Sequence, residues 1–566
     1  MQNSDIRFAK TLPRLSDPLW IVAIVGVITF FVNNCVVTPD IMECRNIVTA
    51  REMVYDGNWI VTTMNGELRL EKPPLPTWLT AVAEMVAPGS LALQRGMAGV
   101  AAMMLVAYFW LFARRVMGIG PLAPTLILLT CYNIVLMGRT ASWDIYTHAF
   151  MMGAIYHLAM ALGKSSDNID APPRWRHFLM AGLMAGLSIM SKGPVSLYAL
   201  LLPFVVVYCL VWRPSIKGKG TALSVMVAIA LVVGSWWYLY IYATCGDALS
   251  AVVGKESGSW LRHSVRPWWY YWKFFLEAGV WALLLLTSIF LPMASEKRRK
   301  SREWLLPVAW MAGSLALLSL LPEKKSRYLL PLCIPACLCM GVVVTWWTER
   351  FKGIPSLLQR RSADARLMRA NAVAIAIAVA VVPVAAYHYL VGAGSMSMAQ
   401  WALLLTVCVA VAVYIDMAAL QLKPMRVVGA VTFLFVTAET LFLPCIKAVV
   451  NNPAMRSVAL IGSDEATASL PLYHDAQEEL RIEVVYAAGK RIGSVDIGDA
   501  DALADSMPCI LLTHTPHPAL PPQLTQKAGT ASLGRFDDNR WAEGHKLYRQ
   551  SLINYATIIE EKRDNK

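Results

Sequence analysis

Repeated long apolar runs constrain this chain more than any other feature. Runs approaching or exceeding about 18 apolar residues recur between residues 19 and 449, separated by short polar or charged turns. A soluble domain cannot bury so many runs, whereas each is suited to the hydrocarbon core of a bilayer. With 57% hydrophobic residues and a mean hydropathy of +0.48, the chain is predicted to be a mainly α-helical, polytopic membrane protein.

The positive charges orient the predicted spans. The net charge is +13, but Lys and Arg gather in alternate connections, as they do in cytoplasmic loops, so the surplus does not indicate a nucleic-acid partner. Basic residues before residue 17 place the N-terminus inside. Leu75–Val86 is apolar enough to suggest a span, yet Arg114 and Arg115 after the next apolar run belong inside. Leu75–Val86 is therefore predicted to be a helix on the outer surface.

This pattern predicts about 13 spans and places both the first loop, 38–95, and the C-terminus outside. A further long outer loop is predicted at 246–270. Residues 1–450 form the predicted transmembrane domain and 451–566 a separate domain. The spans cover 19–37, 97–112, 122–137, 145–162, 178–190, 197–212, 222–242, 274–291, 305–321, 328–347, 372–389, 402–419 and 427–449.

The composition changes after Asn451. Val458–Gly462, Ile482–Tyr486 and Ile510–Thr513 are predicted strands, and Asp475–Leu480 is helical in character. These elements predict a small α/β domain, outside because the number of spans is odd. No GxGxxG motif follows the first strand, so a nucleotide site is not expected there.

The first outer loop is the most polar part of a chain that is only 16% charged. Residues 47–55 within it are predicted to form a short amphipathic helix at the bilayer surface. Asp40 and Glu43 are three residues apart at the start of a helix, so they share one face. Glu71 and Lys72, before two prolines, close the charged stretch.

By the predicted topology, further charged groups face the same side as this loop. They are Arg139, Asp144, Lys192, Arg262, Arg266, Lys324, Lys325 and Arg327. Carboxylates and cations facing one compartment suit a reaction in which a base deprotonates a hydroxyl or amine while cations hold a phosphate leaving group. Other interpretations stay open: Arg139–Asp144 as a structural ion pair, Lys192 as a snorkelling helix end, and 266–271 as an interfacial aromatic belt.

Five motifs appear in an order that resembles a known family. They are the loop motifs Glu43-x-Arg45 to Glu71-Lys72-Pro73-Pro74, then Arg139…Asp144, Ser191-Lys192-Gly193-Pro194, Arg266-Pro-Trp-Trp-Tyr-Tyr, and Lys325-Ser-Arg327-Tyr328-Leu-Leu-Pro331. Together they resemble the bacterial aminoarabinose transferases of lipid A and, more broadly, the protein O-mannosyltransferase-like glycosyltransferases of the GT-C fold. The resemblance covers roughly the first 350 residues.

The resemblance implies a role for each matching residue. The acids Asp40, Glu43 and Asp144 are the catalytic candidates, with Asp40 favoured as the base. Glu71 would lie near a divalent metal ion of unspecified identity, with His263 as a substitute for a histidine ligand that the family has in the long loop. The residues implied at the donor phosphate are Arg45, Lys72, Lys192, Arg266, Arg327 and Tyr328.

The sequence also departs from the family pattern. Met42 stands where the family commonly has the aspartate of Asp-Glu-x-Arg, Arg69-Leu70 replaces an aromatic pair, and Glu256-Ser257 replaces a Glu-His. The predicted function is transfer of a sugar, with inversion, from a polyprenyl-phosphate donor to a glycolipid or protein acceptor on the outer face of the bacterial inner membrane. The alternatives are a transporter or flippase of lipid-linked sugars, which should show internal repeats and mid-span charges, and a scaffold for the C-terminal domain.

Overall fold

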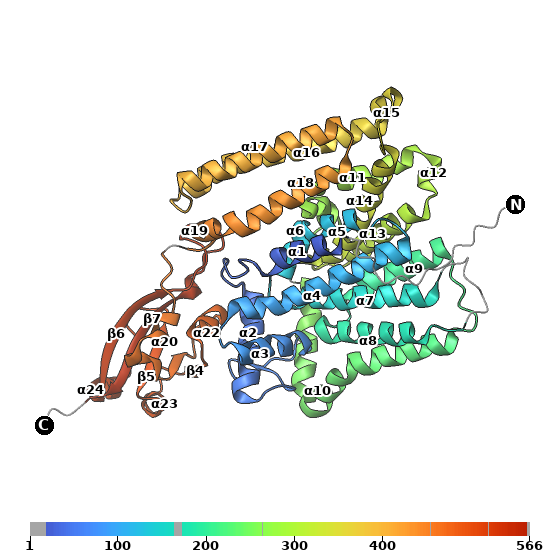
Figure 1. The fold of residues 1–566 in the computed structure, drawn as a ribbon. Coiled ribbons are helices and arrows are strands. Elements are labelled where there is room, and N and C mark those ends of the chain that lie inside the picture. Colours follow the sequence, from blue (N-terminus) through green and yellow to red (C-terminus); the bar gives the residue numbers. More distant parts are fainter. Residues whose placement is uncertain (1–17, 164–171, 263, 453, 519, 563–566) are drawn as a thin grey trace.

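A long helical bundle and a smaller sheet domain make up the protein (Figure 1). The computed structural model describes residues 18–163, 172–262, 264–452, 454–518 and 520–562. The bundle contains α1 (Leu19–Phe31), α4 (Leu91–Leu111), α5 (Leu122–Leu129), α6 (Tyr132–Gly138), α7 (Trp143–Leu162), α8 (Trp175–Lys192), α9 (Leu202–Trp212), α10 (Gly220–Arg262), α11 (Ala282–Phe290), α13 (Arg302–Leu320), α14 (Leu330–Arg350), α16 (Ala363–Ala386), α17 (Met398–Leu420) and α18 (Pro424–Thr437).

The predicted membrane architecture is confirmed in outline. In the described ranges, nine helical segments are long and apolar enough to cross a bilayer, and Leu19–Phe31 and Leu197–Trp212 are shorter apolar helices. Every predicted span falls on a helical segment, but the predicted number of 13 is not confirmed. The span predicted at 122–137 is broken into α5 and α6, and the hydroxyl of Thr130 at the break accepts a hydrogen bond from Trp281 Nε1 at 2.9 Å.

The long outer loop predicted at 246–270 is wrong. The helix α10 continues to Arg262, with a kink at Cys245, and a 3-10 helix then runs from Trp268 to Trp281. Ala248, Leu249 and Val252 pack beside the buried side chain of Leu70. Apolar residues at this spacing form one face of a helix, which explains why the polar residues between them did not end it.

The first loop folds into two helices and a hairpin. α2 (Ile41–Asp56) begins six residues earlier than the predicted helix, and α3 (Leu75–Val86) has the predicted bounds. Between them lies the two-stranded hairpin of β1 (Thr63–Met64) and β2 (Glu67–Leu68). The apolar side of α2 packs against protein, because most of its residues from Glu43 to Met53 are buried between α3 and the sheet domain.

The C-terminal domain contains the predicted mixture of helices and strands, but several assignments were wrong. Its five-stranded sheet has the order β4-β3-β5-β7-β6, with β3 parallel to β4 and β5 and the other pairs antiparallel. The strands are β3 (Leu472–Asp475), β4 (Ile492–Val495), β5 (Cys509–Thr513), β6 (Ala528–Asp537) and β7 (Ile553–Glu561), and the helices include α20 (Ala459–Ser463), α22 (Ile482–Ala488), α23 (Ala500–Asp505) and α24 (Pro522–Lys527).

Of the predicted strands only Ile510–Thr513 is one, within β5. The other two apolar runs form α20 and α22, because a short apolar run buries equally well as one helical face packed on a sheet. Asp475–Leu480, expected to be helical, starts as the last residue of β3 and continues as a turn.

The two ends of the bundle carry different groups. α12 (Glu296–Arg299) and α15 (Leu357–Arg361) lie at one end, and α2, α3 and the sheet domain lie at the other (Figure 1). At the α12 end, Asp364 accepts hydrogen bonds from both terminal nitrogens of Arg298 at 2.7 and 2.8 Å and pairs with Arg350 at 3.0 Å. The basic clusters predicted inside thus converge, at the end opposite the first loop.

Candidate active site at the end of the bundle

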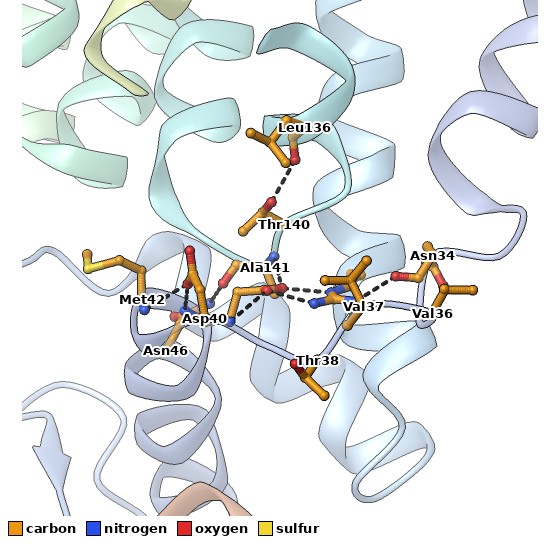
Figure 2. Close-up of polar contacts among 12 residues, drawn as sticks. Asn34, Val36, Val37, Thr38, Asp40, Met42, Asn46, Leu136, Thr140 and Ala141 are labelled. Carbon is orange, nitrogen blue, oxygen red and sulfur yellow. Dashed lines mark hydrogen bonds and ion pairs between the residues drawn. The ribbon is translucent and has the colours of Figure 1, made fainter. Parts of the chain in front are cut away.

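Asp40 caps the helix α2. Its Oδ1 accepts hydrogen bonds from the backbone N–H groups of Met42 at 2.8 Å and Glu43 at 2.9 Å, and its side chain is exposed (Figure 2). Aspartate is among the preferred residues at this position because its carboxylate satisfies N–H groups that the helix itself leaves unbonded. Asp40 is therefore held in a defined orientation while it stays accessible.

Glu43 has a different environment from Asp40. Its side chain is buried, and its two oxygens accept hydrogen bonds from Arg95 Nε and Nη2, each at 2.7 Å. The N–H of Ala141 also donates to Oε1, at 2.9 Å, and Arg95 further donates to the carbonyls of Asn34 and Val37. This network joins α2 to α4 and to the residues just before α7, and its partners Val37 and Ala141 are seen beside Asp40 in Figure 2. Every oxygen of Glu43 is engaged, so the structure favours a positioning role over proton transfer.

Asp144 and Lys192 form a second buried ion pair. Asp144 lies in the first turn of α7 and Lys192 is the last residue of α8, and both side chains are less than a tenth exposed. The Lys192 ammonium lies 5.3 Å from the centre of the Tyr328 ring, and Arg327 is within electrostatic range of the Asp144 carboxylate. Four predicted site residues, from three separate helices, therefore converge at this point.

The structural ion pair considered for Arg139 and Asp144 does not form. Arg139 instead pairs with Glu439 at 2.8 Å and donates to the carbonyls of Thr29 and Val32 at 2.6 and 2.8 Å. These contacts fasten the end of α6 to α1 and to the helical segment after α18, so Arg139 has a structural role. Asp144 was left to pair with a cation from another helix, which sequence proximity does not indicate.

The hairpin leads the chain into Glu71 and Lys72. Arg69, which the sequence analysis did not select, is buried: it donates to the Thr49 hydroxyl at 3.0 Å and lies 4.8 Å from the centre of the Trp143 ring. Burial lowers the pKa of its guanidinium to about 10. Lys72 lies within electrostatic range of Lys192, so its charge acts on the Asp144–Lys192 pair.

The remaining predicted residues are Arg45 and Arg266. Val265 and Glu323 form an antiparallel bridge, and Arg266 N–H donates to the Pro322 carbonyl at 3.2 Å, so the chain before the aromatic run lies against the turn before Arg327. The Arg266 side chain is exposed, as is that of Arg45 on α2. Both roles, like those of the whole predicted set, stay predictions.

Of the two predicted metal ligands, Glu71 and His263, only Glu71 is among the described residues. Glu71 Oε2 is buried, is in no hydrogen bond and lies 4.0 Å from Arg69 Nε, whereas His263 lies outside the described residues. Within the described ranges no three His, Cys, Asp or Glu side chains gather as a metal site would require. Because His263 lies outside these ranges, the predicted metal site stays a prediction.

Arg95 and Arg69 are the principal residues that sequence reasoning missed. Arg95 carries a charge at the start of a predicted span, and a charge in that position usually has a specific partner. The same reasoning applies to Arg69, which with Leu70 replaces the aromatic pair of the family pattern. A second missed group comes from the sheet domain, where Arg540 lies within electrostatic range of Asp40 and Glu43.

This arrangement defines the class of fold. The crystal structure of ArnT from Cupriavidus metallidurans bound to undecaprenyl phosphate matches the chain with a TM-score of 0.66 and 16% identity, over 96% of this chain and 98% of that chain. The apo form of the same protein matches with a TM-score of 0.62. The protein therefore has the GT-C fold of that transferase, including the C-terminal domain.

Sequence comparison leads to the same group of proteins. Residues 71–238 match the family model of dolichyl-phosphate-mannose-protein mannosyltransferases. An undecaprenyl phosphate-alpha-4-amino-4-deoxy-L-arabinose arabinosyl transferase of Pseudomonas fluorescens Pf0-1 is 25% identical over 350 residues, which are 60% of this chain and 57% of that protein. A transferase of the same name from Pseudomonas aeruginosa UCBPP-PA14 is 27% identical over 320 residues, 55% and 56% of the two chains. The chain thus matches little more than half the length of these relatives.

Proposed function

We propose that the protein is a glycosyltransferase that moves a sugar from a polyprenyl-phosphate donor to an acceptor, either a lipid A-like glycolipid or a protein. The observation that carries this proposal is the convergence of Asp144, Lys192, Arg327 and Tyr328 at one end of the bundle, close to the exposed acid Asp40. The fold and the transferases that the sequence matches support the same reaction class.

The cations are suited to stabilise the leaving group, the lipid phosphate. When the bond between the anomeric carbon and the phosphate oxygen breaks, negative charge develops on the lipid phosphate. Lys192 is within electrostatic range of both Arg327 and Lys72, so these three cations are suited to hold that phosphate. Arg327 Nε is buried and is in no hydrogen bond within the described chain, which leaves a donor for a phosphate oxygen.

The carboxylate of Asp40 is suited to take a proton from the acceptor. In the proposed step, an acceptor hydroxyl or amine attacks the anomeric carbon, its proton passes to the Asp40 carboxylate, and the polyprenyl phosphate leaves with the bonding electron pair. A single displacement of this kind inverts the anomeric centre. Glu43 is engaged by Arg95 and Asp144 by Lys192, so Asp40 is the predicted acid that is accessible for proton transfer.

We place the reaction on the outer face of the bacterial inner membrane. The basic clusters at 297–300 and 350–369 lie at the end of the bundle opposite Asp40, and such clusters are retained in the cytoplasm. The sheet domain would then also be periplasmic. A transporter or flippase is less well supported, because the candidate residues lie at the ends of helices rather than midway along them.

The direct test is transfer by the purified full-length protein in detergent. We expect it to release polyprenyl phosphate from an undecaprenyl-phosphate-linked aminoarabinose donor in the presence of lipid A, with inverted product stereochemistry by NMR. Mass spectrometry of lipid A and of glycoproteins from a deletion strain identifies the acceptor, because only the true acceptor loses its sugar. Unchanged lipid A and glycoproteins, together with no donor turnover, would overturn the proposal.

A further inference from the structure

The hairpin between α2 and α3 is too small to hold its own position. Its strands have two residues each, paired as Thr63 with Leu68 and Met64 with Glu67. The two-residue loop is Asn65-Gly66, both with positive φ of 55° and 84°, the geometry of a type I′ turn, which this dipeptide favours. An isolated two-stranded hairpin is marginal at best in water, so this one depends on outside contacts.

The first such contact comes from the edge strand of the C-terminal sheet. Asn65 Nδ2 donates to the carbonyl of Ile492 at 2.9 Å, and the N–H of Ile492 donates back to Asn65 Oδ1, also at 2.9 Å. Ile492 begins β4, an outermost strand of the sheet. The side-chain amide therefore pairs with the open edge in the way that another strand would.

The second contact is ionic. Arg491, the residue before Ile492, pairs with Asp56 at 2.8 Å and lies 3.5 Å from Glu52. Glu52 is buried, and it also accepts hydrogen bonds from the Thr63 hydroxyl at 2.5 Å and the Gly66 N–H at 3.2 Å. α2, the hairpin and the sheet domain thus meet at one carboxylate.

The residues directly after the hairpin connect it to the proposed donor site. Directly after β2, Arg69 N–H donates to the Thr62 carbonyl at 2.8 Å, and Leu70 is buried against Trp237. Glu71 and Lys72 follow at once, and Lys72 lies within electrostatic range of Lys192. Four residues separate the turn that the sheet domain contacts from Glu71.

We propose that the C-terminal domain positions the Glu71-Lys72 segment through this hairpin, with Asn65 and Arg491 as positioning residues. The effect of this segment on the donor rests on the function proposed above, whereas the contacts of Asn65 and Arg491 do not depend on that function. Docking alone does not require them, because the domain already packs on α2 through an apolar interface that includes Cys44 and Val48. The hairpin contacts add a separate link that reaches the site.

The substitutions that test this are Asn65→Gly and Arg491→Ala in the full-length protein. Glycine keeps the positive-φ turn and removes only the amide that pairs with Ile492. The matched control is Asn33→Gly, because Asn33 also has a positive φ, of 53°, and its amide donates to backbone carbonyls elsewhere. Arg456→Ala is the matched control for Arg491, since the side-chain contacts that Arg456 makes with described residues lie within its own domain.

Two measurements are made on each variant. The first is hydrogen exchange of the Arg69 amide, and the second is the affinity for undecaprenyl phosphate in detergent. Loss of the two hydrogen bonds in Asn65→Gly should speed exchange and weaken affinity, each about tenfold, while both controls match the wild type. Arg491→Lys, which keeps the charge, should fall between Arg491→Ala and the wild type in both.

The outcomes separate this inference from the proposed function. Unchanged Arg69 exchange in both hairpin variants would overturn it, because the domain would not position the segment. Faster exchange of the Arg69 amide with unchanged affinity for undecaprenyl phosphate would also overturn it, since the hairpin contacts would then have no effect on donor binding. If the wild type binds no undecaprenyl phosphate, the proposed function fails, and faster exchange in Asn65→Gly alone would still support positioning of the segment by the domain.

Discussion

Asp40 and Glu43 provide a decisive test because the structure assigns opposite roles to two neighbouring acids. Asp40→Asn should leave the fold intact, since asparagine caps helices as well as aspartate does. It removes the proposed proton acceptor, so transfer should fall by about 10²- to 10⁴-fold. Glu43→Gln should instead unfold the protein more readily, because it leaves the buried Arg95 without its anionic partner.

The magnitude for Glu43→Gln follows from its surroundings. Removing one partner of a buried ion pair costs about 3–5 kcal/mol, because the remaining charge stays desolvated. The glutamine carbonyl can still accept one of the hydrogen bonds from Arg95 or Ala141, so the lower part of that range is expected. Asp40→Asn should change the free energy of unfolding by less than about 1 kcal/mol.

The assay pairs unfolding with turnover. Denaturant midpoints of the purified protein in one detergent report stability, and single-turnover transfer at saturating donor reports chemistry. Asp247→Asn is the matched control: Asp247 is an exposed acid on α10, outside the proposed site. It should match the wild type in both measurements.

Two results would contradict this reasoning. The first is near-normal turnover in Asp40→Asn, which would remove Asp40 as the base. The second is a fully stable Glu43→Gln whose turnover falls more than 10²-fold, which would make Glu43 the proton acceptor despite its bond to Arg95.

Three further predictions concern the phosphate site, the sheet domain and the topology. Lys192→Met should weaken undecaprenyl phosphate binding and destabilise the fold by about 3–5 kcal/mol, and adding Asp144→Asn should restore the unfolding midpoint but not the binding. Burial raises the pKa of Asp538 to about 6 from 3.8. The contribution of this carboxyl group to folding stability is therefore full below pH 3.8 and is lost as the pH rises through 6. Relative to Asp538→Asn, the free energy of unfolding of the wild type should fall by up to about 3 kcal/mol between pH 4 and pH 7 in denaturant unfolding. In a background without the native cysteines, an impermeant thiol reagent applied to intact spheroplasts should label Ser463→Cys but not Lys300→Cys, and the reverse pattern would invert the proposed orientation.

The helical architecture could be predicted because it depends on local properties. Length and apolarity suffice to make a segment helical in a bilayer, where each backbone group must find its hydrogen bond within the segment. The bounds of α3 followed from its apolar run, Leu75–Val86. The C-terminal domain was harder, because short apolar runs such as Ile482–Tyr486 have no period that separates a strand from one face of a helix.

The sequence by itself determined that this is a helical membrane protein and that its acids and cations lie mainly at the ends of helices. Only the tertiary structure decided which charges meet: Glu43 with Arg95, Asp144 with Lys192, and Arg139 with Glu439. The physical reason is that a buried charge takes whichever partner the packing brings within reach, and helices distant in the chain supply those partners. The sheet domain's contact with the hairpin has the same origin, since Asn65 and Ile492 are adjacent only after the bundle and the sheet have folded.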